Sequence, residues 1–304
     1  MKVLIATKYG FCFGVEHAIE KARKLLDEKE TVYCLGPLIH NSHVVDRLSR
    51  AGLRVVDDLS QIGAGTCEQC HSDTPTERNS SAERVSSANH VPTVLIRSHG
   101  CRPELLEEIK KRGFELADAT CILVKRAQKL VGELYQQGYQ VVIVGDPDHP
   151  EVQGAVGHAP GKVIVVDGPD DLDKLPSRGR LAVISQTTKS AEDFGKIVGL
   201  IAMRGYEEMK VVNTICRETA RRQASAVELC RKVDVMFVLG SHHSANTGEL
   251  AQLCRRNGVD TYHLQDWQEF KPEYIVGSNT AGVTAGASTP DWIIKEFVSN
   301  LQKL

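Results

Sequence analysis

Three cysteines each follow a short apolar segment and precede a segment with the apolar spacing of a helix. Cys12 lies in GFCFGV, Cys121 in DATCILVKRAQKL and Cys216 in NTICRETARRQAS. Three thiolates from separate parts of a chain can hold zinc or an iron–sulfur cluster. Zinc sites normally use short local spacings such as C-x-x-C, so cysteines about a hundred residues apart favour a central cluster. A cubane held by three cysteines keeps one iron free for a substrate.

Polar residues recur at a fixed distance after these cysteines. His40, His149 and Ser244 each lie 28 residues after the preceding one of the three. Cysteines that only fill a core have no reason to keep such an interval. A further apolar segment in each third ends on small polar side chains, at Ser98 and His99, at Thr187 and Thr188, and at Ser288.

Alternating strands and helices must position these side chains. Their lengths predict a parallel sheet in each third of the chain, and ligands bind beyond the carboxyl ends of such strands. We therefore expect an α/β fold of three quasi-equivalent domains with small parallel sheets, arranged as a pseudo-threefold trefoil around a central iron–sulfur cluster. The expected domains are residues 1–118, 119–213 and 214–304, the last with a C-terminal helix that begins at Pro290 after a Thr289 cap.

The polar residues at the strand ends suit an anion. Unpaired amides and the dipole of a helix N-terminus attract a phosphate or a diphosphate, although a structural hydrogen bond explains any single histidine equally well. Glu151, two residues after His149, could act as a general acid toward a leaving hydroxyl, or simply complement the charge of a helix N-terminus. Thr187 and Thr188 could orient the same hydroxyl or cap the next helix.

Composition excludes several other classes of protein. The chain has 304 residues, 41% of them apolar and 25% charged, which is enough for two or three domains. A net charge of −2 and the lack of a basic block argue against nucleic acid as the partner. No apolar run approaches the roughly 20 residues that span a bilayer, and no signal peptide is evident, so we expect a cytoplasmic protein. Its nine cysteines should then remain reduced.

Residues 65–92 interrupt the repeating pattern. This segment has almost no large apolar residues and is typical of a flexible surface insertion. It contains Cys67, Cys70 and His71 in a C-x-x-C-H spacing, which occurs in haem attachment and as half of many zinc sites. Haem attachment needs an exported protein, and zinc lacks a second pair of ligands even if His71 or His90 contributes. A loop is the favoured interpretation.

The ordered motifs closely resemble one family over nearly the whole chain. GFCFGV, HNSHVVDRL, RSHG, DATC, HPEV, QTT, NTIC, GSHHSANT and TAGASTPDW are similar to the hydroxymethylbutenyl diphosphate reductases, the terminal enzymes of the methylerythritol phosphate route to isoprenoids. The resemblance implies a [4Fe-4S] cluster on Cys12, Cys121 and Cys216, with the substrate hydroxyl on the free iron. Two electrons and protons would then remove that hydroxyl as water, giving isopentenyl and dimethylallyl diphosphates from (E)-4-hydroxy-3-methylbut-2-enyl diphosphate.

The resemblance also implies roles for the polar residues. Glu151 would deliver the proton and Thr187 would orient the hydroxyl. The diphosphate would bind at His40, His99, Ser244, Asn246 and Ser288, with Thr188 and Ala245 in the same site. His149 would lie close by and act both in catalysis and in substrate binding. Ala245 stands where many relatives have a serine, and residues 65–92 are not part of the usual pattern. A ferredoxin or a flavodoxin would donate the electrons.

Two other functions remain open from the sequence. A hydro-lyase could use the same open iron as a Lewis acid and would need no reductant. An iron–sulfur sensor would need an element that binds nucleic acid, and the sequence has no basic helix or recognition motif.

Overall fold

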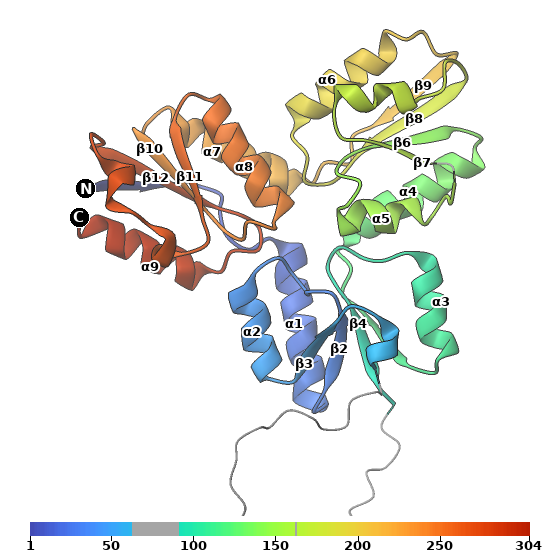
Figure 1. The fold of residues 1–304 in the computed structure, drawn as a ribbon, viewed down its shortest axis with the longest axis horizontal. Coiled ribbons are helices and arrows are strands. Elements are labelled where there is room, and N and C mark those ends of the chain that lie inside the picture. Colours follow the sequence, from blue (N-terminus) through green and yellow to red (C-terminus); the bar gives the residue numbers. More distant parts are fainter. Residues whose placement is uncertain (63–90, 162) are drawn as a thin grey trace, which may run out of the picture.

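The computed structural model describes residues 1–62, 91–161 and 163–304. Within them, three parallel sheets of four strands lie at three corners around a common centre (Figure 1). This arrangement confirms the predicted α/β trefoil. Most of the predicted insertion 65–92, including Cys67, Cys70 and His71, lies outside the described residues. No helix in the described part of the chain has the length and the apolar character that crossing a bilayer would require.

Each sheet has helices on both faces. The first sheet, in the order β3-β2-β4-β5, is covered by α1 and α2 on one face and by α3 and a short 3₁₀ helix, η1, on the other. Its elements are α1 (Phe13–Glu28), β2 (Val32–Leu35), α2 (Ser42–Arg50), β3 (Leu53–Val56), η1 (Leu59–Gln61), β4 (Thr93–Ile96), α3 (Pro103–Lys111) and β5 (Glu115–Asp118).

The second sheet repeats this pattern in the order β7-β6-β8-β9, with α4 and α5 on one face and α6 on the other. Its elements are α4 (Ile122–Gln136), β6 (Gln140–Val144), α5 (Pro150–Val156), β7 (Val163–Val166), η2 (Pro169–Lys174), β8 (Arg180–Ser185), α6 (Ala191–Ala202) and β9 (Glu208–Val212).

The third sheet, β11-β10-β12-β1, has α7 and α8 on one face and α9 on the other. Its elements are β1 (Lys2–Ile5), α7 (Arg217–Cys230), β10 (Val235–Leu239), α8 (Ala245–Arg256), β11 (Asp260–Leu264), η3 (Trp267–Glu269), η4 (Pro272–Ile275), β12 (Thr280–Ala285) and α9 (Asp291–Gln302).

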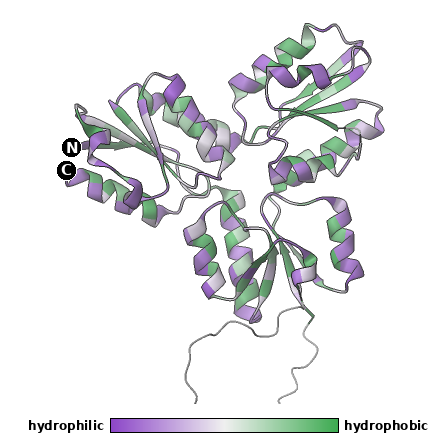
Figure 2. Ribbon diagram, in the orientation of Figure 1, coloured by the Kyte–Doolittle hydropathy of each residue, from purple (hydrophilic) through white to green (hydrophobic). Residues whose placement is uncertain are grey.

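The central strands are apolar because helices cover both of their faces. Every residue of β4 and of β10 is buried, as expected for parallel strands inside a three-layer unit. The helices instead bury one stripe each, such as Val15, Ala18 and Ile19 of α1. Figure 2 shows this contrast between the apolar strands and the amphipathic helices. Each sheet therefore has its own core, and the centre between the sheets remains free for polar side chains.

The N-terminal strand belongs to the third sheet. We expected residues 1–118 to form the first domain, but Lys2–Ile5 of β1 pair with Thr280–Val283 of β12. β1 occupies the place that β5 and β9 occupy in the other two sheets. In this sheet β1 pairs the edge of β12 that would otherwise be open.

The start of the C-terminal helix also differs from the prediction. Helix α9 begins at Asp291, and Pro290 rather than Thr289 is its N-cap residue. The Thr289 hydroxyl donates instead to the carbonyl of Leu239, 2.9 Å away. The threonine thus connects the entry of α9 to the end of β10.

Candidate functional site

The three predicted ligand thiols lie where the chain passes from one sheet to the next. Cys12 follows β1 of the third sheet and precedes α1 on the first, and Cys121 follows β5 of the first sheet and precedes α4 on the second. Cys216 follows β9 of the second sheet and precedes α7 on the third. All three line one cavity. Residues far apart in the sequence therefore meet because every crossing passes the centre of the molecule.

The thiols are free to bind a ligand. Each cysteine is the N-cap residue of its helix, and none of the three side chains makes a capping hydrogen bond. A Cβ added at Gly14 would lie 2.8 Å from Sγ of Cys121 and 3.9 Å from Sγ of Cys12. Both sulfurs thus border the same glycine, and a larger residue there would fill the space between them.

The surroundings of the thiols favour a bound cation. Burial raises the pKa of the Cys12 and Cys121 thiols, and the amides of the first helical turns oppose this shift. A thiolate at this depth needs positive charge, which a metal supplies. Arg222 supplies some as well, because its side chain is only 2% exposed and lies close enough to lower the pKa of Cys12. Its Nη2 donates to the carbonyl of Gly10 at 2.8 Å.

Three imidazoles form a cluster on another wall of the cavity. The ring centroids of His40 and His99 are 4.7 Å apart, and those of His99 and His149 are 5.3 Å apart. Burial lowers the pKa of His40 and of His149 to about 4, and the pKa of His99 is also well below its usual value. The rings are therefore neutral at pH 7.

The ring nitrogens have capacity for a ligand. Nδ1 of His149 accepts from the amide of Glu151 at 3.2 Å, which places the ring proton on Nε2. Nε2 of His40 and Nδ1 of His99 are buried without a hydrogen-bond partner among the described groups. The three rings can bring ligand nitrogens within 4.8 Å of one another, so they suit either an anion or a metal ion.

Glu151 and Thr187 form a buried pair. Glu151 is 4% exposed, and its Oε1 and Oε2 accept from the amide and the hydroxyl of Thr187, both at 2.7 Å. Burial raises the pKa of Glu151, and the two bonds from Thr187 oppose this shift. A carboxyl group with a raised pKa that lines a cavity is suited to proton transfer.

Polar groups of the third sheet complete the cavity. Ser244 caps α8 and accepts from the amide of Thr247, while Nδ2 of Asn246 is buried with no partner among the described atoms. The hydroxyl of Ser288 donates to the carbonyl of His40 at 3.0 Å and so joins the third unit to the first. Ala245 lines the same cavity with a methyl group.

All thirteen predicted site residues line this one cavity, and the structure adds others. Thr219 is 5% exposed and also lines it. It lies three residues after Cys216, in the first turn of α7, so helical spacing could have identified it. Arg222 lies in a charged stretch that is typical of a surface helix, and no pattern in the sequence indicates its burial.

Comparison with protein families gives one match over nearly the whole chain. The model described as LytB protein matches residues 3–302. The chain is 40% identical over 304 residues to the 4-hydroxy-3-methylbut-2-enyl diphosphate reductase of Geotalea uraniireducens, covering 100% of this chain and 98% of that protein. It is also 40% identical over 304 residues to the reductase of the same name from Trichlorobacter lovleyi, covering 100% and 99%.

Two solved structures share the fold. The E-1-hydroxy-2-methyl-but-2-enyl-4-diphosphate reductase of Plasmodium falciparum superposes with a TM-score of 0.87 at 25% identity, over 99% of this chain and 88% of that one. A structure described as (E)-4-hydroxy-3-methyl-but-2-enyl diphosphate reductase, the terminal enzyme of the non-mevalonate pathway, gives a TM-score of 0.65 at 37% identity over the full length of both chains.

Proposed function

Because this chain belongs to the LytB protein family, we propose that it reduces (E)-4-hydroxy-3-methylbut-2-enyl diphosphate to isopentenyl and dimethylallyl diphosphates. The reaction consumes two electrons and two protons and releases the substrate hydroxyl as water. One observation carries the proposal beyond the family relationship. Three free thiols and the buried pair of Glu151 and Thr187 line the same cavity.

The residues around the thiols fit an iron–sulfur cluster. Cys12, Cys121 and Cys216 would hold a [4Fe-4S] cluster, since they offer three uncapped thiols, a glycine that leaves room between two of them and a buried guanidinium nearby. When bound, the cluster supplies the electrons and an iron without a cysteine ligand. We propose a ferredoxin or a flavodoxin as its electron donor. We assign the enzyme to the cytoplasm because this compartment keeps ligand thiols reduced.

Glu151 holds the proton that the leaving hydroxyl requires. Its burial favours the neutral carboxyl group, which is the form that can donate a proton. The two bonds from Thr187 fix the orientation of the carboxyl group. The Thr187 hydroxyl thus lies beside the proton donor, where it can orient the substrate hydroxyl.

The imidazoles and the third-sheet residues bind the diphosphate. Neutral rings of His40, His99 and His149 donate hydrogen bonds to its oxygens without repelling one another. The unpaired amide of Asn246 and the N-terminal end of α8 add donors to the same cavity. Ser244, Thr188 and Ser288 supply hydroxyls around the same volume.

The proposal is tested on protein purified or reconstituted without oxygen. Iron and sulfide analysis should give four of each per chain, and electron paramagnetic resonance of the reduced protein should change when the substrate is added. Product formation should depend on a reductant such as reduced ferredoxin. Activity without any reductant would favour a hydro-lyase, and a protein that binds no iron would contradict the proposal.

A further inference from the structure

Two segments that line the cavity come from different sheets. The loop after β8 carries Thr187 and Thr188 and continues directly to Lys189. Helix α8 carries Ser244 as its cap, followed by Ala245 and Asn246. Since both segments line the same cavity, the distance between them decides whether one ligand can contact both.

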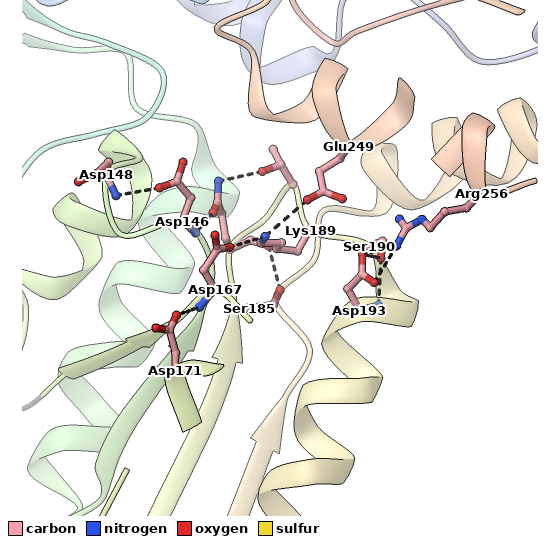
Figure 3. A network of polar contacts seen from close by, with 12 residues as sticks. Asp146, Asp148, Asp167, Asp171, Ser185, Lys189, Ser190, Asp193, Glu249 and Arg256 are labelled. Carbon is pink, nitrogen blue, oxygen red and sulfur yellow. Dashed lines mark hydrogen bonds and ion pairs between the residues drawn. The ribbon is translucent and has the colours of Figure 1, made fainter. Parts of the chain in front are cut away.

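Lys189 connects the loop to α8 through the carboxylate of Glu249, and the carboxylate of Asp167, in the same sheet as the loop, fixes the lysine. Its Nζ lies 2.7 Å from Oδ1 of Asp167, which follows β7, and 3.5 Å from Oε1 of Glu249 on α8 (Figure 3). The Lys189 and Glu249 side chains are only 15% and 16% exposed. Solvent therefore screens this contact less than it screens an ordinary surface ion pair.

A second ion pair joins the second sheet and its helices to the third, farther along α8. Nη1 of Arg256, at the end of the helix, lies 2.8 Å from Oδ1 of Asp193 on α6 (Figure 3). Arg256 is the last residue of α8, whereas Glu249 is in its first half. The bridge through Lys189 is thus the one closer to the substrate residues.

The apolar cores of the second and third sheets do not connect the loop to α8. In the part of the chain that the structure describes, the apolar core around α6 and the core around α7 and α8 consist of different residues. A cavity of about 270 Å³ lies between the loop and α8, and both Lys189 and Glu249 line it. Oε2 of Glu249 is buried without a hydrogen-bond partner among the described groups. The position of α8 against the loop therefore depends on polar contacts more than on close packing.

We propose that Lys189 is a positioning residue for substrate binding. Its bridge to Asp167 and Glu249 holds the loop with Thr187 and Thr188 against the N-terminal half of α8, so that both segments contact the diphosphate substrate together. Lys189 does not line the cavity that holds the thiols, and it acts through the segments that do. The inference rests on the proposed function, because it assigns the loop and α8 to the same substrate.

The test uses the holoenzyme with Lys189→Met. We expect KM to rise about three- to tenfold while kcat stays within about twofold, because the change removes binding and leaves the reacting groups in place. Lys189→Arg keeps the charge and should restore KM. Glu249→Ala should raise KM in the wild-type background and have no further effect together with Lys189→Met, because the two side chains act as one unit.

A matched control is Lys232→Met just after α7, which removes an exposed pair with Glu228 at 2.6 Å and should leave KM unchanged. An unchanged KM in Lys189→Met overturns the inference. So does a loss of iron or of thermal stability that Lys189→Arg fails to reverse, because the role of Lys189 would then be structural.

If the wild-type holoenzyme does not reduce the substrate, the proposed function fails separately. The affinity for inorganic diphosphate then replaces KM: a loss in Lys189→Met supports positioning, and an unchanged affinity rejects it.

Discussion

Glu151 and Thr187 are joined by two hydrogen bonds that use both oxygens of the carboxyl group. The amide of Thr187 donates to Oε1 and its hydroxyl to Oε2, each at 2.7 Å. Glu151 lies in the first turn of α5, the helix after β6, and Thr187 follows β8, the neighbouring strand. Parallel pairing of these strands brings their carboxyl ends, and hence the two residues, to the same edge of the sheet.

The first prediction concerns proton delivery. Glu151→Gln should lower kcat roughly 10²- to 10⁴-fold, since the amide has nearly the same shape but no acidic proton. Iron content and substrate binding should be preserved, because the amide oxygen of the glutamine can still accept from the backbone amide of Thr187 while its nitrogen donates to the Thr187 hydroxyl. Steady-state kinetics together with iron analysis measure both quantities. Full turnover in the variant would remove Glu151 from the mechanism.

The second prediction is a shift in pH dependence. Burial raises the pKa of Glu151, so kcat should fall as the pH rises through that pKa and the acid loses its proton. Hydrogen bonds from Thr187 to the ionised form lower the same pKa. Thr187→Val removes the hydroxyl and should move the falling limb of the profile to higher pH. A limb that stays in place or moves to lower pH would mean that another group controls it.

The third prediction separates the ligand cysteines from the others. Replacing Cys12, Cys121 or Cys216 with serine should abolish most iron binding and all turnover, because two thiolates and a hydroxyl hold a cluster poorly. Cys101→Ser is the control, since Cys101 is equally half-buried but lines a different cavity. Iron analysis and the visible absorption of the cluster measure the difference. Normal iron content in any of the three variants would exclude that cysteine as a ligand.

The fourth prediction follows from the neutral imidazoles. The pKa of His40 and of His149 falls from 6.5 to about 4 on folding. Between these two pH values the unfolded chain therefore binds more protons than the folded protein. The free energy of unfolding should therefore decrease as the pH falls from about 6.5 toward 4, by up to about 1.4 kcal/mol per pH unit for each ring. Urea unfolding at several pH values measures the slope. His149→Asn keeps a good cap for α5 and should make the slope shallower; an unchanged slope would contradict the assignment.

The repeating arrangement of the chain was predictable because it leaves a local trace. Each cysteine lies between an apolar strand and an amphipathic helix, and the 28-residue interval to His40, His149 or Ser244 reflects one helix and one strand of similar length. The place of β1 is implicit in the same repeat, because its apolar run precedes Cys12 as β5 and β9 precede the other two cysteines. The predicted domains were continuous ranges of residues, and such ranges cannot assign the N-terminal strand β1 to the third sheet.

Other features depend on contacts that the sequence does not mark. Arg222 is one of several charged residues on α7, and its burial follows only from the way the N-terminal segment packs on that helix. Lys189 and Glu249 lie 60 residues apart with no shared motif. Their pairing depends on how the second and third units meet. Such contacts are set by tertiary packing, and local patterns of residue type do not record them.

The last prediction concerns the segment between η1 and β4, where Cys67 and Cys70 lie. Its composition favours a loop, and thirteen predicted site residues from the described part of the chain line the cavity. Replacing Cys67 and Cys70 together with serine should therefore leave iron content and kcat within about twofold of the wild type, which anaerobic iron analysis and steady-state kinetics would measure. His71→Ala is a companion variant, because a C-x-x-C-H metal site would need that ring as well. Bound zinc that disappears in both variants, or a clear loss of activity, would show instead that this segment binds a metal.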